Sequence, residues 1–196
     1  MNYADRHNDL GTAYLDENRF DDAEREFREA LQLDPRHSRA HCNLGILYAV
    51  QGELHDAEQE FEKSISLEPG LTTAHFNLGN LYKKQGKLDE AVKEFKEAIN
   101  ADPSNVGAHN NLGNIYGIQG KINEAEKEFE EALIIDPENA DANNNLALVY
   151  EKQDRYLDAI NQWKAYVPIA FKTPGHQDRI DMIDKRIKDL EDKLHH

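Results

Sequence analysis

Residues 108–137 read AHNNLGNIYGIQGKINEAEKEFEEALIIDP, and their pattern recurs along most of the chain. A segment with leucine, glycine and tyrosine is followed by an alanine, then by a phenylalanine four residues later, and finally by a proline. Equivalent segments begin every 34 residues and read NDLGTAY (8–14), CNLGILY (42–48), FNLGNLY (76–82), NNLGNIY (110–116) and NNLALVY (144–150). A fixed period of this length is typical of a protein built from stacked structural repeats.

Each repeat contains two segments in which apolar residues recur at helical spacing. In the third repeat these segments are about residues 73–85 and 88–100, and Gly86 lies between them. Glycine suits the left-handed conformation that often ends a helix, and asparagine and aspartate tolerate it better than most residues. The equivalent positions of the other repeats are Asn18, Gly52, Gly120 and Asp154. The sequence therefore predicts a helix–turn–helix in every repeat.

Acidic–proline pairs are expected to end the second helix of the first four repeats, because proline cannot continue a helix. These pairs are Asp34-Pro35, Glu68-Pro69, Asp102-Pro103 and Asp136-Pro137. Residues with short polar side chains follow, and Ser38, Asn105 and Asn139 are predicted to cap the next helix.

Small residues at one position of each helix predict close contact within a pair. They are Gly45, Gly79 and Gly113 in first helices and Ala57, Ala91 and Ala125 in second helices. Because one pair cannot bury its apolar face alone, neighbouring repeats must stack on each other.

The order Leu-Gly-x-x-Tyr, Ala-x-x-x-Phe and Pro at this period resembles the tetratricopeptide repeat family over residues 4–173. The resemblance divides the chain into five units, at residues 4–37, 38–71, 72–105, 106–139 and 140–173. It implies an all-α, right-handed superhelical solenoid whose first helices line a concave groove. The Asn-Leu-Gly-Asn-x-Tyr stretches are also similar to the tetratricopeptide region of O-linked GlcNAc transferase.

The end of the chain departs from the repeat. Pro168 and Pro174 are expected to end helical structure, and residues 174–194 are expected to form a C-terminal helix with apolar residues at spacings of 3 and 4. These apolar residues are Ile180, Ile183, Ile187, Leu190 and Leu194. A capping helix over the fifth unit is favoured over a dimeric coiled coil, because the stretch is shorter than three heptads. Residues 195–196 are interpreted as a remnant of a purification tag.

Asparagines gather on one side of the predicted first helices. When each unit is numbered from its first residue, the leucine, glycine and tyrosine fall on one side and positions 2, 5, 6, 9, 12 and 13 fall on the other. Side-chain amides can bind the alternating N–H and C=O groups of an extended peptide. The asparagine-rich side of the first helices is therefore predicted to bind such a peptide. The predicted peptide-binding residues are Asn43, Asn77, Asn80, Asn110, Asn111, Asn114, Asn144, Asn145, Ile46, Phe76, Lys83 and Lys84.

The same asparagines have a structural interpretation, in which position 6 bonds to a neighbouring repeat and fixes the stacking. For position 6 alone the two interpretations are balanced. Additional asparagines at positions 5 and 9 favour peptide binding, because structural bonding needs only one amide in each repeat. A basic clamp for a C-terminal carboxylate, which some family members have, is not expected, since Asn8, Thr12, Thr73 and Asn77 occupy four of its five places.

Histidine replaces the family's usual tryptophan at position 4, as His7, His41, His75 and His109. Parallel side chains on stacked helices lie too far apart to share a metal ion easily, so these residues are expected to pack between helices rather than to bind zinc. Protonation near pH 6 is expected to loosen the stack.

Composition excludes several classes of protein. The net charge of −15 argues against nucleic acid and anionic membranes, and no stretch is apolar enough to insert into a membrane. Cys42 is the only cysteine, and no phosphate loop or nucleophile motif occurs, so neither a cofactor nor a catalytic or metal site is expected.

The sequence thus predicts a cytoplasmic, non-enzymatic scaffold for protein–protein interaction that holds an extended segment of a partner protein. The alternative is an assembly protein that forms homo-oligomers through its C-terminal helix or by stacking of repeats.

Overall fold

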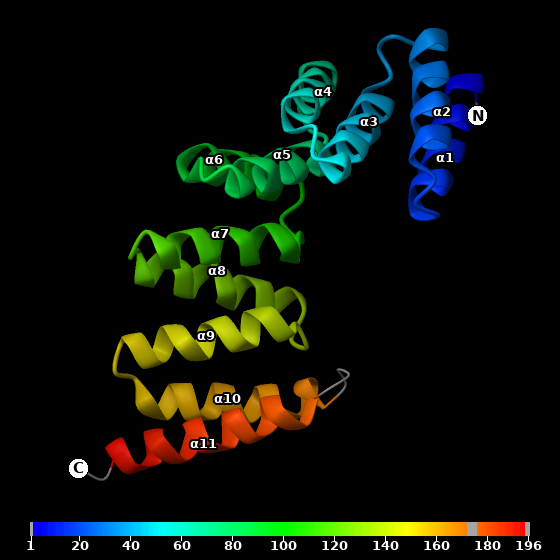
Figure 1. The fold of residues 1–196 in the computed structure, drawn as a ribbon. Helices are drawn as coiled ribbons and strands as arrows, with labels where there is room; N and C mark the ends of the chain where they lie inside the picture. The colour runs from blue at the N-terminus through cyan, green and yellow to red at the C-terminus, as the bar shows by residue number, and fades with distance from the viewer. Residues whose placement is uncertain (1, 172–175, 195–196) are drawn as a thin grey trace. The chain divides into compact units, whose positions relative to one another are not determined.

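A computed structural model describes residues 2–171 and 176–194, and all regular elements among these residues are α-helices. The chain divides into two compact units, residues 1–103 and 104–196 (Figure 1). The tag interpretation of residues 195–196 and the helix-ending role of Pro174 concern positions outside the described residues. The division into five repeats and a cap remains our proposal.

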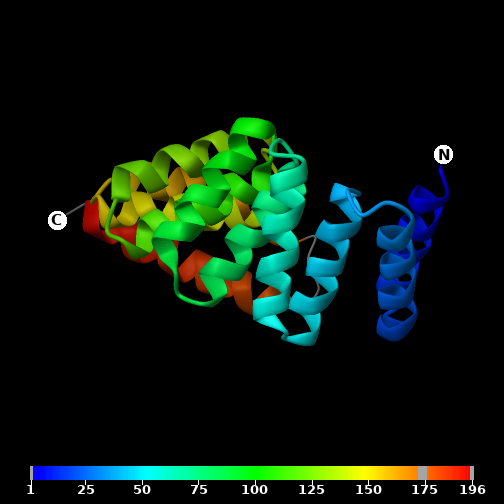
Figure 2. The same ribbon diagram turned by 90° about the horizontal axis from the view of Figure 1, so that it is seen from above.

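The first unit consists of three helical hairpins. In each hairpin the two helices lie side by side (Figure 2). The hairpins are α1 (Tyr3–Asp16) with α2 (Phe20–Leu33), α3 (Ser38–Gln51) with α4 (Leu54–Leu67), and α5 (Thr72–Lys84) with α6 (Leu88–Ala101). Successive hairpins pack through α2 against α3 and through α4 against α5.

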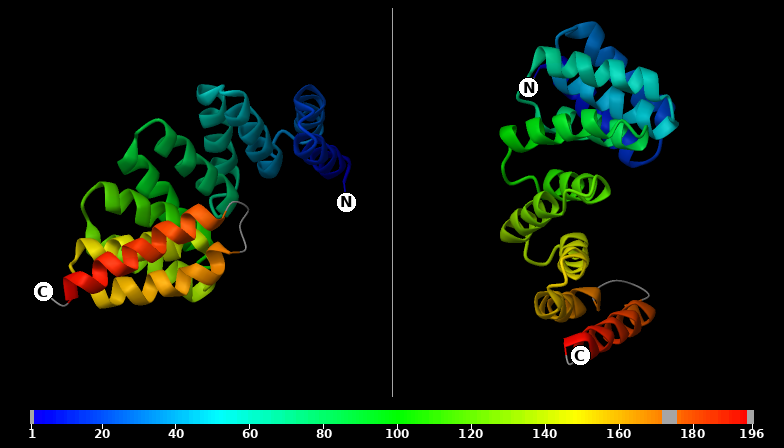
Figure 3. Two further views of the ribbon diagram at one scale, coloured as in Figure 1. Left: turned by 60° about the horizontal axis from the view of Figure 1, so that its bottom comes forward. Right: turned by 90° about the vertical axis from the view of Figure 1, so that its left-hand side faces the viewer.

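The second unit consists of two hairpins and a final helix. The hairpins are α7 (Val106–Ile118) with α8 (Ile122–Ile135) and α9 (Ala140–Lys152) with α10 (Tyr156–Ala170), and the final helix is α11 (His176–Leu194). Helix α8 packs against α9, and α11 lies along α10 (Figure 3).

The predicted turns within the hairpins are confirmed. Gly52, Gly86 and Gly120 have positive φ, and Asn18 and Asp154 adopt φ of 58° and 57° in the outer repeats. Left-handed backbone after the first helix is therefore common to all five hairpins.

The predicted helix starts are partly confirmed. Asn105 and Asn139 accept hydrogen bonds from the backbone N–H groups of Ala108 and Ala142, as capping residues do. The prediction for Ser38 is wrong, because His37 caps α3 through its Nδ1 atom and Ser38 is already helical.

Pro168 does not end helical structure as expected, because α10 continues through it to Ala170. Proline lacks an N–H group, so it removes the hydrogen bond to the carbonyl four residues earlier. Pro168 lies in the last turn of α10, where Phe171 N–H still bonds to the Val167 carbonyl. The loss is therefore confined to the end of the helix.

Close contact between the two helices of a hairpin depends on glycine. A Cβ atom built on Gly113 would lie 2.7 Å from the ring of Phe129, and one on Gly45 would lie 2.8 Å from the ring of Phe61. Both rings are almost completely buried. The glycine leaves the space that the phenylalanine ring fills, which explains why the two residue types recur together.

The final helix packs against α10, and the burial of its apolar stripe favours the capping interpretation over a coiled coil. Ile180, Ile183, Ile187 and Leu190 are buried within the chain, so their apolar stripe is not available to a second copy. Leu194, the last member of the stripe, is exposed.

Polar contacts fix α11 in place. Glu151 at the end of α9 accepts hydrogen bonds from the indole N–H of Trp163 on α10, at 2.7 Å, and from Arg186 on α11, at 2.6 Å. The Arg186 guanidinium also lies 5.5 Å from the centre of the Trp163 ring. One carboxylate therefore joins three helices.

We expect Gly113→Ala to destabilise the second unit, because its methyl group would overlap the Phe129 ring. Overpacking of this kind costs about 1–3 kcal/mol. Gly117→Ala on the same helix is the matched control, since a Cβ there meets nothing within 4 Å. The control should leave the stability unchanged or raise it by up to about 1 kcal/mol. Urea unfolding followed by circular dichroism measures both, and equal midpoints would contradict the close-contact explanation.

Candidate functional site

In each of the first four repeats, a histidine on the first helix pairs with a glutamate on the second helix. The Nδ1–Oε2 distances are 2.7 Å for His7 and Glu26, 2.6 Å for His41 and Glu60, 2.7 Å for His75 and Glu94, and 2.8 Å for His109 and Glu128. In the fifth repeat the same two positions hold Asn143 and Gln162, whose amides bond at 2.6 Å. Packing of these histidines between helices is confirmed, but the carboxylate partner was not predicted.

The other ring nitrogen reaches the loop before the repeat. His75 Nε2 lies 2.9 Å from the Pro69 carbonyl, and in the fifth repeat the Asn143 amide donates to the Pro137 carbonyl. Both nitrogens of His75 thus face acceptors, and only the imidazolium can donate to both. The hydrogen bond to Glu94 is the main cause of a pKa of His75 above 6.5.

At position 5 of the first helices, Asn110 faces the next repeat rather than an open wall. Asn110 is 9% exposed and donates to the side-chain oxygen of Asn139 at the start of α9. Phe76 is half-buried, with its ring edge-on to that of Phe95 at 5.9 Å. Cys42 is buried, and burial raises the pKa of its thiol to about 12. Stacking of successive repeats thus buries Asn110, whereas the half-buried Phe76 packs within its own repeat.

The asparagines at position 6 form different contacts in different repeats. Asn43 donates to Asn8 at 2.9 Å and to Thr12 at 3.2 Å, both on α1. Asn145 donates to Asn114 on α7 at 2.9 Å and accepts from Asn144. These contacts support the structural interpretation of the amides.

Asn77 makes a different contact, because it donates to the Thr73 carbonyl of its own helix. Its carboxamide therefore does not join two helices through this bond.

A cavity of about 210 Å³ lies beside these amides in the first unit. Helices α3 and α4 provide an apolar floor and one wall, and α5 provides the polar wall. The lining residues are Ile46, Ala49, Val50, Leu54, Phe61, Asn77, Asn80, Leu81 and Lys84.

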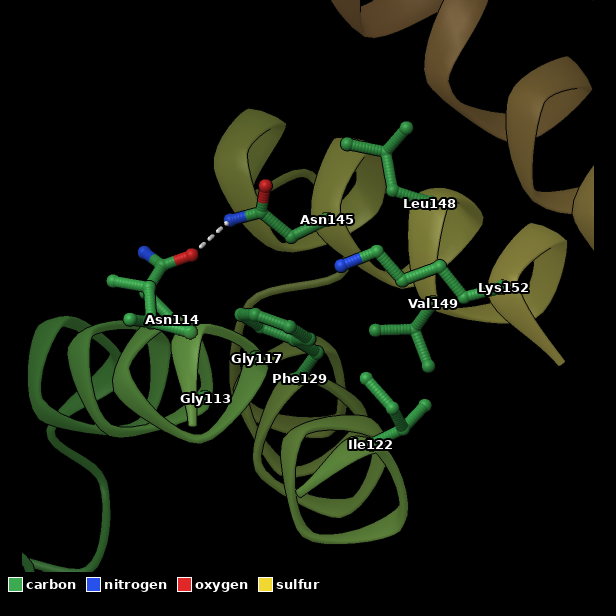
Figure 4. A pocket seen from close by; sticks show the side chains of 10 residues that line it. Gly113, Asn114, Gly117, Ile122, Phe129, Asn145, Leu148, Val149 and Lys152 are labelled. Carbon is green, nitrogen blue, oxygen red and sulfur yellow. Dashed lines mark hydrogen bonds between the residues drawn. The ribbon is translucent and has the colours of Figure 1, made fainter. Parts of the chain in front are cut away.

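A second cavity of about 270 Å³ lies in the second unit, between α7, α8 and α9 (Figure 4). Its lining residues are Gly113, Asn114, Gly117, Ile118, Ile122, Phe129, Asn145, Leu148, Val149 and Lys152. The hydrogen bond between Asn114 and Asn145 lies at its rim, and the Lys152 side chain extends across it toward Asn145 (Figure 4).

Half of the twelve predicted peptide-binding residues line the two cavities, namely Ile46, Asn77, Asn80, Lys84, Asn114 and Asn145. The other six do not, namely Asn43, Phe76, Lys83, Asn110, Asn111 and Asn144. Lys83 is half-buried, and this burial lowers the pKa of its ammonium group.

Sequence reasoning missed Lys152 and the relation between the two cavities. All nine residues that line the first cavity have counterparts 68 residues later, and all nine counterparts line the second. The signal was available in the sequence, because Val50, Lys84, Ile118 and Lys152 occupy the same position of successive repeats. An apolar residue and a lysine alternate there, so the pattern has twice the repeat period.

The described residues contain no helix long and apolar enough to cross a membrane. Within the same ranges, no cluster of three or more histidine, cysteine, aspartate or glutamate side chains could hold a metal ion.

The pairing of His75 with Glu94 predicts that acidification strengthens the third repeat, contrary to the expected loosening. A raised pKa in the folded state gives stability that is present below pH 6.5 and is lost as pH rises through the folded value. We expect His75→Asn with Glu94→Gln, the pair that the fifth repeat uses, to lower the melting temperature more at about pH 6 than at about pH 8. Melting followed by circular dichroism tests this, and a pH-independent difference would refute it.

The two kinds of asparagine contact predict different effects on stability. Asn43→Ala leaves the buried Asn8 oxygen without its partner, which should cost about 1–3 kcal/mol. Asn77→Ala removes one bond to its own helix and gains helix propensity, so the unfolding free energy should change by less than about 0.5 kcal/mol. Urea unfolding measures both variants. Similar losses in the two would show that Asn77 is also a structural residue.

Comparison with known families agrees with the helical hairpins. A tetratricopeptide repeat model matches residues 8–71, a second one matches residues 60–93, and a TPR repeat model matches residues 79–120 and 113–154. Together the matches extend from residue 8 to residue 154. No curated protein matches the chain, and the similarity to O-linked GlcNAc transferase stays a prediction.

Several solved structures share the fold. PilF of Pseudomonas aeruginosa is 21% identical with a TM-score of 0.79, covering 96% of this chain and 91% of that one. MamA is 23% identical with a TM-score of 0.73, covering 87% and 93%.

YrrB, described as a TPR protein with an unusual peptide-binding site, is 21% identical with a TM-score of 0.71, covering 93% of this chain and 90% of that one. At these identities the likeness concerns the fold alone. With its recurring sequence matches and its all-α succession of packed helical hairpins, the chain belongs to the tetratricopeptide repeat family.

Proposed function

We propose that this scaffold binds an extended segment of a partner protein through the asparagine-rich side of its first helices. Tetratricopeptide repeats are scaffolds for protein–protein interaction and are generally non-catalytic. The observation that carries the proposal is the presence, in each unit, of a cavity that combines an apolar floor with asparagine amides. A cytoplasmic location also belongs to this proposal.

The amides at the cavities retain hydrogen-bonding capacity. Within the described part of the chain, Asn114 accepts a bond from Asn145 through its oxygen but donates none through its nitrogen. Its nitrogen points away from Asn145 in Figure 4. Asn77 donates one bond and accepts none among the described residues. A carboxamide has two donor hydrogens and two acceptor lone pairs, so each of these side chains can bind a peptide backbone group.

The structural contacts of other asparagines complement this role. Asn145 is held by Asn114 and Asn144, which fixes its rotamer beside the cavity. A side chain that is already ordered loses less conformational entropy when a ligand binds. Structural bonding and ligand binding are therefore compatible functions of one row of amides.

Self-association is the remaining alternative, and the burial of the α11 apolar stripe within the chain favours the stacking of repeats over the C-terminal helix as its route. Light scattering over a range of concentrations would detect it. A strict monomer would exclude homo-oligomers.

We expect the combined variant Asn77→Ala and Asn114→Ala to lose binding of peptides selected on the unmodified chain from a displayed library of short random sequences. The loss of one hydrogen bond at each site should weaken binding there by about fivefold, since about 1 kcal/mol is lost per bond. Asn100→Ala on α6 is the matched control, because Asn100 is exposed and lines neither cavity. A library that yields no binder, or equal binding by both variants, would contradict the proposed function.

A further inference from the structure

The two cavities occupy equivalent places in the repeats and share an apolar side chain, an asparagine and a lysine in their linings. Each has a buried phenylalanine ring in its lining, Phe61 or Phe129, and an asparagine at position 6, Asn77 or Asn145. Corresponding residues also supply an exposed β-branched side chain from one repeat and a lysine from the next.

An exposed apolar side chain contributes to the lining of each cavity. Val50 is 58% exposed and Ile118 is 69% exposed, and each belongs to the lining of its cavity. Burying such side chains against a ligand contributes about 25 cal/mol for each Å² of apolar area removed from water. An apolar ligand group is therefore the natural occupant of each cavity.

The size of the cavities restricts this occupant. Their volumes of about 210 and 270 Å³ lie below the roughly 300–1,000 Å³ of typical small-molecule pockets. Each can take one apolar side chain rather than a cofactor. The open space above Gly117, where a Cβ would meet nothing within 4 Å, belongs to the second cavity.

The charge beside each cavity is positive in a chain whose net charge is −15. Lys84 and Lys152 are the charged lining residues of the two cavities, and neither ammonium forms an ion pair with a carboxylate of the described residues. A ligand carboxylate would meet an unpaired cation there, although the overall field of the protein repels anions.

We propose that both cavities bind the same motif in an extended peptide, an apolar side chain with an aspartate or glutamate two residues away. This inference rests on the proposed function and specifies its ligand. In an extended chain, residues i and i+2 face the same side and are separated by about 6.6 Å. The apolar side chain enters the cavity, the carboxylate reaches the lysine, and the position-6 asparagine bonds to the peptide backbone between them.

The first experiment selects peptides from a displayed library of short random sequences on the full chain. Apolar–x–Asp or apolar–x–Glu should be enriched, which would be notable because a protein of charge −15 attracts basic peptides non-specifically. Enriched peptides without an acidic residue would overturn this inference but leave the proposed function intact. Failure to enrich any peptide would overturn both.

Charge reversal tests the role of the lysines on the selected peptides. Lys84→Glu combined with Lys152→Glu should weaken binding of the selected peptides about fivefold or more. The same variant should bind again when the acidic residue of the peptide is changed to lysine. Lys63→Glu combined with Lys127→Glu is the matched control, because these exposed lysines on α4 and α8 have the same charge and line neither cavity.

The neutral pair Lys84→Gln and Lys152→Gln provides a second test if charge reversal lowers the melting temperature. Equal effects of the test and control pairs would overturn the inference.

Filling the cavities tests the apolar part. Ala49→Leu and Gly117→Leu place a side chain at equivalent lining positions and should abolish binding together, while Gly117→Leu alone should leave the first cavity functional. Gly117→Ala controls for the change in helix propensity. Unchanged peptide binding by the filled variant would overturn the inference. The inference would also fail if the unmodified chain formed a dimer that Gly117→Leu dissociates, because the occupant of the cavity would then be a second copy of the chain.

Discussion

The contact between a glycine on the first helix and a phenylalanine ring on the second sets the spacing of the first four hairpins. The Gly113 backbone lies against the Phe129 ring so closely that a single methyl group would not fit. The distance between the helices is then fixed by the ring rather than by longer, adaptable side chains. The polar contacts across each hairpin depend on this distance, because hydrogen bonds weaken within a few tenths of an ångström. The cavities depend on it as well, since Phe129 and Phe61 are part of their linings.

The pair formed by His75 and Glu94 orients the two helices of the hairpin and the loop that precedes them. Its histidine joins the second helix through Nδ1 and the preceding loop through Nε2, so one side chain holds three segments. Asn143 and Gln162 make equivalent contacts with neutral amides. The geometry of the contact is thus common to both versions, whereas its response to pH belongs to the ionisable one. A buried imidazole with two acceptors differs in this respect from the aromatic packing residue that the family uses there.

The candidate site was only partly predictable from the positions of residues around a helix. Asn77 and Asn145 at position 6 line cavities, but Asn110 at position 5 is buried against the start of α9. Helical geometry gives the direction of a side chain from its own axis and not the position of the next hairpin. Position 5 lies on the boundary between the packed and open sides, so a small difference in stacking decides its environment. Lys152 was missed because a single lysine does not indicate a site until the recurrence of the lining residues over two repeats is recognised.

The sequence alone determined the all-α repeat, the turn positions and the small residues at helix contacts, because these follow from local conformational preference and from a period repeated five times. Gly86 and Asn18 adopt the left-handed backbone that their residue types tolerate. The tertiary structure alone decided that His75 meets Glu94, that α11 covers α10, and that amides such as Asn145 bond across helices beside a cavity. These contacts join residues from separate helices. Their existence depends on the distance and rotation between helices, which packing sets and local sequence does not encode.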